Sequence, residues 1–569
     1  MKLFPEATDP KQIHKILTSP YFQKALDKME RRCKRYRENP VEALHFHLYR
    51  KFFIDGDRRS FEDIYFTRRG RLSYLALAVL LHRRPENIEA LEDAIWAICE
   101  EYTWVLPAHT SDLGDHYNTE VIDLFSAETG FALSEILYLL ENELDPKVVR
   151  RIRECLEERI FQMYLNHTYT WENVSMNWAS VCAGCVGGAF IYCAPERFHL
   201  VHDRILDTMH TFLKGFGEDG ICLEGIHYWG YGFGFFTYFA QLLYEFTDGK
   251  ENLFDNPICQ KTAFFQEHAF LRKNYTISFS DGEQIGSFLP GLTHKLHKLY
   301  GSRLLPVEYA AFTEYCHRFP AYLRNFFWVD PDGVACTPSE KTDKYFPTSQ
   351  WFVSSAQDLC FAAKAGHNNE PHNHNDIGTF LLMSDDGQIL CDFGAGEYTR
   401  DYFRNATRYQ YLCTSSFGHS VPIINGEGQK PGKQYCGKVL SHDSVFTVDM
   451  AGAYDTQGLR SAVRQMQLSE DGFLLKDTFD GEGLQVTERF VTMVLPERSG
   501  STIHLGQYRI ETAPEMTATI SSEIITNHEG LPDTLYLIDY ALGDAKEFIL
   551  NVKRDQLCCF GTKGDSFQC

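Results

Sequence analysis

The sequence lacks several features that would place it in other protein classes. It contains no run of about 18 apolar residues, so no membrane-spanning helix is expected. Its first residues, MKLFPEATDPKQ, have no apolar core of the kind that a signal peptide carries. The 17 cysteines are scattered over 569 residues, without the dense spacing of a disulfide scaffold. We therefore expect reduced thiols and a cytoplasmic location, and a secreted or periplasmic location stays open.

Positive charge is also scarce. The formal net charge is −22, which argues against nucleic acid as a partner, because phosphate binding needs a basic surface. Net charge governs solubility and long-range steering rather than local chemistry, so a basic site can still lie on an acidic protein. Aromatic residues are abundant at 14%. Flat apolar rings suit carbohydrate binding, and they suit a Phe-rich core equally well.

The distribution of local patterns predicts helices first and strands afterwards. Residues 1–330 read as helices, without a strict repeat that would indicate a regular solenoid. The polar, turn-rich segment 331–350 predicts a domain junction. Residues 351–569 contain short β-type runs bounded by turn residues, with a hairpin at SDDGQ. This order favours a helical domain followed by a separate antiparallel sheet domain.

The segment EPHNHNDIGTF, residues 370–380, holds the most specific chemical signal. It places His372 and His374 two residues apart, and an extended chain would direct both imidazoles to one side. Asp392 closes an apolar run, and His419 lies in a later polar segment. Imidazole and carboxylate are ligands of divalent metals, so a set made of one histidine of this segment, Asp392 and His419 would suit zinc or manganese.

Further polar and aromatic residues interrupt the helical region in three places. Asn177 and Trp178 begin the small-residue segment NWASVCAGCVGG, where a plain helix cap is the simpler reading. The stretch EGIHYWGYG, residues 224–232, combines aromatics with glycines that permit close approach of a ligand. The candidate binding or catalytic residues of this stretch are His227, Tyr228 and Tyr231. The segment LPAH adds His109, and the segment DYFRNATR adds Arg404 and Arg408. A guanidinium fork suits uronate or sulfate, and a solvated charged face is the alternative.

Taken together and in order, these motifs resemble the heparinase II/III family of polysaccharide lyases and its alginate-lyase relatives. The matching motifs are Asn177–Trp178, EGIHYWGYG, HNHNDIGTF, DFGAGEY and GHSVPIINGEGQ, and with the His109 region they span about residues 100–460. The resemblance implies an incomplete (α/α) toroid followed by antiparallel β-sandwich layers. It also implies β-elimination on glycosaminoglycans of the hyaluronan, chondroitin or heparan type, which yields unsaturated oligosaccharides.

Residue by residue, the resemblance implies distinct roles. Asn177 would neutralise the substrate carboxylate, Tyr231 would be the catalytic phenol with Tyr228 as second choice, and His372 would transfer a second proton. His374, Asp392 and His419 would hold a largely structural metal. Met176 stands where the family often has a second Asn, so the second carboxylate-neutralising group stays open, with His109 and His227 as candidates. Trp178, Tyr228, Arg404 and Arg408 would contribute to substrate binding.

Other functions remain to be weighed against a glycosaminoglycan lyase. An alginate or other oligouronide lyase would use the same machinery. A glycoside hydrolase on an (α/α) toroid needs two carboxylates that flank the scissile bond, and no paired-acid motif stands out beside Glu128 and Glu224. A non-catalytic glycan-binding protein would explain the aromatics but not the histidine and aspartate cluster. The expected partner is an acidic polysaccharide or oligosaccharide, with no nucleic acid and no membrane, and a homo-oligomer stays open.

Overall fold

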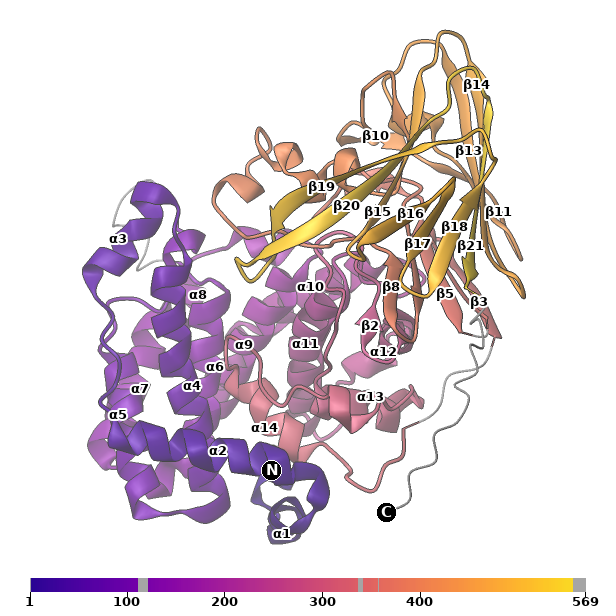
Figure 1. Ribbon diagram of the computed structural model, residues 1–569. Helices are drawn as coiled ribbons and strands as arrows, with labels where there is room; N and C mark the ends of the chain where they lie inside the picture. The colour runs from indigo at the N-terminus through magenta and orange to yellow at the C-terminus, as the bar shows by residue number, and fades with distance from the viewer. Residues whose placement is uncertain (1, 111–120, 336–340, 357, 556–569) are drawn as a thin grey trace, which may run out of the picture. The chain divides into compact units, whose positions relative to one another are not determined.

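The computed structural model describes residues 2–110, 121–335, 341–356 and 358–555, and it divides into two compact units (Figure 1). Unit 1 comprises Met1–Pro338 and Glu397–Arg408, and unit 2 comprises Ser339–Gly396 and Tyr409–Cys569. The division after Pro338 falls within segment 331–350. The sequence analysis did not anticipate that residues 397–408, which follow a strand of unit 2, belong to the helical unit.

Unit 1 is built from helices whose starts are encoded locally. Several begin at a proline in the first turn, which lacks the N–H that a helix start leaves unsatisfied. Side chains such as Asp9, Ser19 and Asn256 accept a backbone hydrogen bond at these starts. The α-helices are α1 (Pro10–Thr18), α2 (Pro20–Glu38), α3 (Phe46–Asp55), α4 (Arg59–His82), α5 (Pro85–Cys99), α6 (Leu124–Leu140), α7 (Pro146–Leu156), α8 (Gln162–Asn166), α9 (Asn177–Cys193), α10 (His202–Leu213), α11 (Ile226–Phe246), α12 (Pro257–Ala269), α13 (Pro290–Tyr300) and α14 (Phe319–Phe327).

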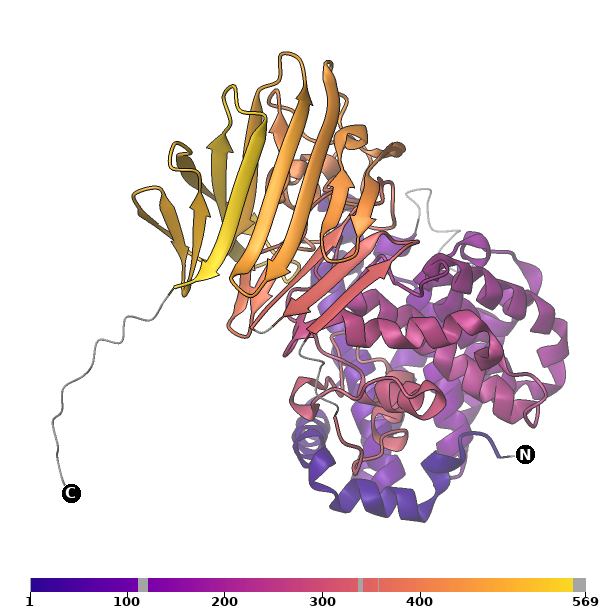
Figure 2. The same cartoon turned by 90° about the vertical axis from the view of Figure 1, so that its right-hand side faces the viewer.

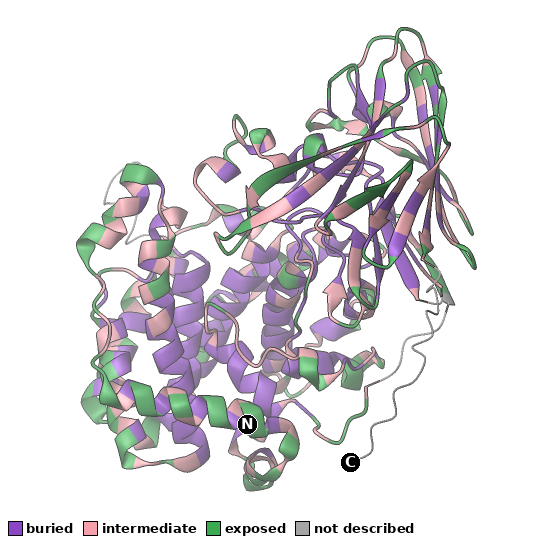
Figure 3. Ribbon diagram, viewed as in Figure 1, coloured by how far each residue is buried: buried purple, intermediate pink, exposed green. Residues whose placement is uncertain are grey.

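Helix α9 lies at the centre of unit 1 because its side chains are small. It packs against α6, α10 and α11, and nearly all of its residues are buried (Figure 3). A helix that is apolar all round must be surrounded by other elements. Gly188 faces the ring of Phe131 on α6, and Gly184 approaches the backbone of Phe235 on α11. The glycines therefore allow aromatic-rich helices to approach α9 closely.

Unit 2 consists of antiparallel sheets (Figure 2). The largest has the order β11-β12-β13-β14-β21-β18-β17-β16, and sheets β19-β20-β15-β9 and β3-β4-β5-β7-β8 pack with it around one apolar core. The pair β10-β6 and, in unit 1, the pair β1-β2 form small ribbons. The bounds of the strands are β1 (Phe270–Arg272), β2 (Tyr275–Thr276), β3 (Lys341–Phe346), β4 (Trp351–Ala356), β5 (Leu359–Lys364), β6 (His367–Asn368), β7 (Phe380–Ser384), β8 (Gly387–Leu390), β9 (Ile423–Ile424), β10 (Gly432–Cys436), β11 (Lys438–His442), β12 (Phe446–Asp449), β13 (Leu459–Ser469), β14 (Gly472–Gly481), β15 (Val486–Thr492), β16 (Pro496–Ser499), β17 (Thr502–Leu505), β18 (Tyr508–Thr512), β19 (Ala518–Thr526), β20 (Pro532–Ala541) and β21 (Glu547–Arg554).

Three further expectations can be compared with the described residues. The hairpin expected at SDDGQ is present, because β7 and β8 pair antiparallel with Ser384 opposite Gly387. Among the described residues, no helix is both long enough and apolar enough to cross a membrane. The described cysteines are free thiols.

The close contact between α9 and α6 predicts the effect of one methyl group. A Cβ at position 188 would lie 2.5 Å from the buried ring of Phe131. We expect Gly188→Ala to lower the free energy of unfolding by about 1–3 kcal/mol through overpacking, measured by urea denaturation. Gly230→Ala on α11 is the matched control, because the nearest atom to its Cβ would be 4.0 Å away. Equal stability of both variants would contradict this account of the packing.

Candidate active site and metal centre

Asn177 lies at the start of α9, held against the tyrosine-bearing turn of α11. Met176 is the N-cap and no side chain caps this helix, so Asn177 is not the cap that the simpler reading assumed. A Cβ on Gly232 would lie 3.1 Å from the Cβ of Asn177, and Ser180 Oγ donates to the Gly232 carbonyl at 2.8 Å. The glycine therefore brings the buried carboxamide next to the turn that carries Tyr228 and Tyr231.

Tyr231 belongs to a buried cluster with Glu128 of α6 and Arg318, the residue that precedes α14. The Tyr231 hydroxyl donates to the Glu128 carboxylate. The Arg318 guanidinium lies 3.8 Å from the centre of the Tyr231 ring, and its Nε is 3.0 Å from both Glu128 oxygens. Arg318 also contacts Glu314 at 2.8 Å. Arg318 thus places a cation against the Tyr231 phenol, and no sequence motif indicated this residue.

Burial governs the protonation of this cluster. It raises the pKa of Tyr231 well above its usual value, and the Glu128 charge acts in the same direction while Arg318 opposes it. Burial also raises the pKa of Glu128 to about 7, against the opposing effect of Arg318. Tyr231 therefore keeps its proton at neutral pH, and Glu128 can gain or lose one there.

Tyr228 belongs to a different network, formed with the returning segment 397–408. Its hydroxyl lies 2.8 Å from that of Tyr398, which donates to Asp281 at 3.0 Å. Tyr402 donates to the other oxygen of Asp281 at 2.5 Å. Burial and the Asp281 charge raise the pKa of Tyr228. The two candidate tyrosines thus have separate partners, Glu128 for one and the Tyr398–Asp281 pair for the other.

The predicted substrate-binding residues of unit 1 lie in unlike surroundings. His109 Nδ1 is 2.8 Å from Asp123, and its ring packs edge to face with Trp178 at 4.9 Å. His227 is half-exposed, 3.8 Å from Glu283. Arg408 is buried with its Nη2 3.4 Å from Asp281 Oδ2, whereas Arg404 is exposed beside Asp401. The two arginines therefore do not share one face, because Arg408 is turned inward by the buried carboxylate.

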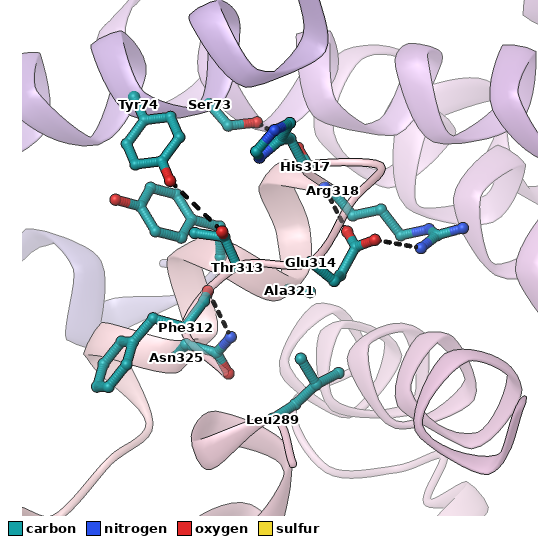
Figure 4. A pocket seen from close by; sticks show the side chains of 11 residues that line it. Ser73, Tyr74, Leu289, Phe312, Thr313, Glu314, His317, Arg318, Ala321 and Asn325 are labelled. Carbon is teal, nitrogen blue, oxygen red and sulfur yellow. Dashed lines mark hydrogen bonds and ion pairs between the residues drawn. The ribbon is translucent and has the colours of Figure 1, made fainter. Parts of the chain in front are cut away.

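Two hollows flank Arg318 (Figure 4). In the hollow of Figure 4, Glu314 and Arg318 pair across the loop that leads into α14, and Thr313 lies 3.4 Å from the hydroxyl of Tyr74. The second hollow is lined by Tyr65, Arg69, Phe125, Glu128 and Arg318 among others. Arg318 thus borders both small hollows, and Glu128 borders the second.

Unit 2 brings the three predicted metal ligands together. His374 lies in the loop before β7, Asp392 follows β8, and His419 begins the segment before β9. One ligand atom from each lies within 4.8 Å of the others, and all three side chains are fully buried. His419 Nδ1 is 3.2 Å from Asp392 Oδ2. Two imidazole nitrogens and one carboxylate oxygen form a donor set that fits zinc or manganese.

Surrounding hydrogen bonds orient two of these ligands. His419 Nε2 donates to the Cys413 carbonyl at 2.9 Å, and Gly394 N donates to Asp392 Oδ1 at 3.0 Å. These bonds leave Nδ1 of His419 and Oδ2 of Asp392 to face each other, the arrangement that metal-binding side chains require. Although burial opposes it, the Asp392 and Asp376 carboxylates raise the pKa of His419.

Lys364 and Asp376 form a second buried pair beside the three ligands. Lys364 Nζ is 2.7 Å from Asp376 Oδ1, and Asp376 Oδ2 is 3.7 Å from His419 Nδ1. Burial lowers the pKa of Lys364, but the carboxylates of Asp376, Glu370 and Asp392 together outweigh burial, and the pKa is raised. The centre therefore carries a fixed positive charge that balances one of its two aspartates.

The loop that carries His374 is anchored through its backbone. Gln429 donates to the Ile377 carbonyl and accepts from the Ile377 N–H, both at 2.7 Å. Ser416 Oγ donates to the Asn375 carbonyl at 2.6 Å. The buried Arg464 donates to the carbonyls of Gly378 and Ser420 at 2.9 and 2.5 Å, and so ties together the segments that contain His374 and His419. The motif ending at Gln429 is thus a structural partner of HNHNDIGTF.

The expectation of an extended HxH pair is wrong. Residues 369–379 form a loop rather than a strand, and His372 has a φ of 54°, in the left-handed region. His374 is fully buried at the metal centre, whereas His372 is half-buried. Two hydrogen-bonded turns shape this loop, with Asn373 N bonded to Glu370 O and Thr379 N bonded to Asp376 O, which an alternating pattern does not reveal. The two histidines therefore have separate environments.

Comparisons with known proteins agree with this architecture. Residues 338–488 match the family model described as Heparinase II/III-like, C-terminal. No curated protein matches the sequence. Among solved structures, heparinase III aligns with a TM-score of 0.62 at 14% identity, covering 88% of this chain and 78% of that one. A heparan sulfate lyase HepC mutant from Pedobacter heparinus aligns with a TM-score of 0.58 at 12% identity, covering 96% and 92%.

A third structure, the Streptomyces coelicolor A3 chondroitin AC lyase in complex with chondroitin sulphate, aligns with a TM-score of 0.55 at 12% identity and covers 98% of this chain and 83% of that one. At such low identity the likeness establishes the fold. The predicted resemblance is confirmed by the family match over residues 338–488. The predicted order, helical region first and antiparallel sheets afterwards, is confirmed over nearly the whole chain.

The raised pKa of Glu128 predicts a pH dependence of stability. A carboxyl whose pKa rises from 4.5 to about 7 on folding binds more protons in the folded state between these pH values. Its contribution to the free energy of unfolding therefore falls as pH rises through this window, by about 3 kcal/mol in total. We expect Glu128→Gln to lose this dependence. Urea denaturation of both proteins at several pH values measures the difference, and parallel curves would contradict the prediction.

Proposed function

We propose that this chain, with a C-terminal region of the heparinase II/III-like family and the fold of heparinase III, is a polysaccharide lyase that cleaves uronic-acid-containing glycosaminoglycans by β-elimination. One observation carries the proposal. A buried carboxamide, Asn177, lies next to a helical turn whose Tyr231 is held by a carboxylate and stacked with a guanidinium. These are the groups that removal of a proton next to a carboxylate requires.

The reaction begins with the acidity of the C5 proton of the uronate. The substrate carboxylate resists further negative charge, so hydrogen-bond donors at its oxygens stabilise the enolate-like state that develops. Asn177 supplies one donor. His109 is favoured over His227 as the second, because His109 contacts Trp178, the neighbour of Asn177, whereas His227 is directed toward Glu283.

The protonation of Tyr231 favours the acid role. Because burial raises its pKa, the phenol is neutral at physiological pH and can donate its proton to the departing glycosidic oxygen. Arg318 stabilises the phenolate that remains, and Glu128, with a pKa of about 7, can return a proton. His372 is the proposed base for the C5 proton. Tyr231 performs both transfers if the C5 proton and the leaving oxygen lie on the same face of the sugar ring.

We also propose that His374, Asp392 and His419 hold a divalent metal, zinc or manganese, with a structural role. When bound, the ion would cross-link the segments before β7, after β8 and before β9. The three side chains are buried, and hydrogen bonds to His419 Nε2 and Asp392 Oδ1 orient two of them, which supports a preformed site. Asp376 and Lys364 would set the charge around it.

The lyase proposal predicts an ultraviolet signal. β-Elimination creates a double bond conjugated to the carboxylate, so absorbance should rise when the protein acts on hyaluronan, chondroitin sulfate, dermatan sulfate, heparan sulfate, heparin or alginate. We expect Tyr231→Phe to lower kcat by about 10²–10⁴, the usual contribution of a proton-transfer group. Tyr228→Phe is the matched control, because it removes the same hydroxyl one helical turn earlier, and we expect the smaller loss.

The outcomes of this assay separate the alternatives. A larger loss in Tyr228→Phe would transfer the catalytic role to the Tyr398–Asp281 network. New reducing ends without an absorbance rise would show hydrolysis and overturn the proposal. The member of the panel that gives the fastest rise identifies the polymer, and a rise on alginate alone would indicate an alginate lyase.

The metal proposal predicts coupled loss of metal and of stability. We expect His419→Ala to contain less than one tenth of the zinc or manganese found in the purified wild-type protein, measured by atomic emission. Chelation should lower the Tm of the wild-type protein but leave that of His419→Ala unchanged, because binding to the folded state stabilises it. His442→Ala, on strand β11 away from the three ligands, is the control. Equal metal content in all three proteins would exclude this site.

A further inference from the structure

Helix α3 presents one aromatic side chain, Phe46, to solvent, and the rings of Tyr49 and Phe53 beside it are half-buried. Phe46 is 70% exposed, and its ring lies nearly parallel to that of Tyr49, with centroids 6.4 Å apart and an interplanar angle of 17°. The rings of Tyr49 and Phe53 follow at 5.8 Å. Both the outer surface of α3 and its partly buried side are visible in Figure 3. The helix thus carries a row of flat apolar surfaces.

The charge of α3 is opposite in sign to that of the whole chain. The segment from His45 to Ile54, HFHLYRKFFI, contains no acidic residue, whereas the chain as a whole has a net charge of −22. His45, His47 and Arg50 are exposed, and the two imidazole rings stack at 5.5 Å. Asp55 is the last residue of α3 and is exposed, and Asp57 pairs with Lys51, so Arg50 is the cation of α3 that is available to an anionic ligand. Aromatic rings interleaved with cationic groups suit an anionic sugar chain.

A second basic group reaches the end of α3 from the returning segment of unit 1. The helix ends at Gly56, whose φ of 81° closes the last turn in the left-handed region. A Cβ there would meet the Cβ of Arg400 at 3.3 Å, so Arg400 lies directly on this turn. The Arg400 side chain is partly exposed, with Nε 4.0 Å from Asp401. The basic surface therefore continues from α3 onto Arg400.

The rings of α3 pack onto the buried aromatic core of unit 1, and this core, which includes Phe61, Tyr65 and Phe125, reaches the candidate active site without forming a surface itself. Tyr49 packs edge to face on Phe61 at 5.6 Å, and Phe61 stacks with Tyr65 at 6.0 Å. Ring contacts then run from Tyr65 through Phe125 to His109 and Trp178. Helix α3 also packs against the short helix Pro107–His109. A substrate chain held at Asn177 and His109 that extends along this side of unit 1 meets α3.

We propose that α3 is a distal subsite for the anionic polysaccharide substrate, on which Phe46 and Tyr49 stack against sugar rings while Arg50 and Arg400 pair with carboxylate or sulfate groups. This inference rests on the proposed function and adds a site to it, away from the reacting bond. Because only chains long enough to span from His109 to α3 can use it, the subsite makes affinity increase with chain length.

The test compares chain lengths in two surface variants of the full-length protein. Phe46→Ala/Arg50→Ala removes one ring and one charge from α3. Leu200→Ala/Arg150→Ala is the matched control, because both of its residues are exposed and lie on other helices. Fluorescently labelled tetrasaccharides and dodecasaccharides of heparan sulfate and chondroitin sulfate serve as probes. Binding is measured in a Tyr231→Phe background, which slows turnover.

We expect the Tyr231→Phe protein with an unchanged α3 to bind dodecasaccharides more tightly than tetrasaccharides. The α3 variant should raise the Kd for dodecasaccharides about five-fold relative to the control variant, and so reduce the ratio of the two affinities. Added salt should weaken dodecasaccharide binding less in the α3 variant, because one ion pair has been removed. With Tyr231 intact, the ratio of KM for polymer to KM for tetrasaccharide should rise in the α3 variant.

Several results would overturn the subsite. Equal Kd values for tetrasaccharides and dodecasaccharides in the protein with an unchanged α3 would contradict it. An equal change of the dodecasaccharide Kd in the α3 variant and in the control variant would contradict it as well. Binding to vesicles of anionic phospholipid, lost in the α3 variant without an effect on either sugar, would assign α3 to a membrane surface instead. Length-dependent binding that is lost in the α3 variant, in a protein that produces no double bond, would support the subsite and remove the lyase proposal.

Discussion

The candidate active site depends on one buried ion pair, that of Arg318 with Glu128. A lone charge at either position would be unfavourable to bury, and Arg318 compensates Glu128 while it is itself paired with both Glu128 and Glu314. Their pairing fixes the loop before α14 against α6 and leaves the Glu128 carboxylate positioned to accept from Tyr231. The same guanidinium covers the tyrosine ring, so structural pairing and control of the phenol are performed by one side chain.

Unit 2 also contains buried ion pairs that hold loops in place, formed by different residues. Arg464 is fully buried and pairs with Asp477 and Glu488. It also donates hydrogen bonds to the carbonyls of Gly378 and Ser420. Lys364 and Asp376 form a second such pair at the metal centre. Buried charge therefore holds irregular loops in defined positions, where the sheets alone would leave their carbonyl groups without donors. The proposed metal would reinforce loops that are already tied together.

Local patterns were sufficient for much of the molecule. The change from helical to alternating periodicity and the hairpin at SDDGQ followed from residue types and spacing, because each is set by neighbours in the chain. The set of His374, Asp392 and His419 was implied by the resemblance to the lyase family, and the structure brings these three residues together. The left-handed φ of His372 did not follow, since loop geometry depends on turns and on contacts with Gln429 and Ser416. Arg318 stands alone in the sequence and carries no motif.

By itself, the sequence determined the order of the two architectures and the resemblance to a family of lyases, because these rest on short-range periodicity and on chemically rare residue combinations. That resemblance in turn indicated the three residues of the candidate metal site. Only the tertiary structure decided which partner each tyrosine has, that Arg408 turns inward to Asp281, and that residues 397–408 join the helical unit. The reason is that burial and charge pairing act between residues separated by a hundred or more positions, and no local pattern records which distant group will compensate a buried charge.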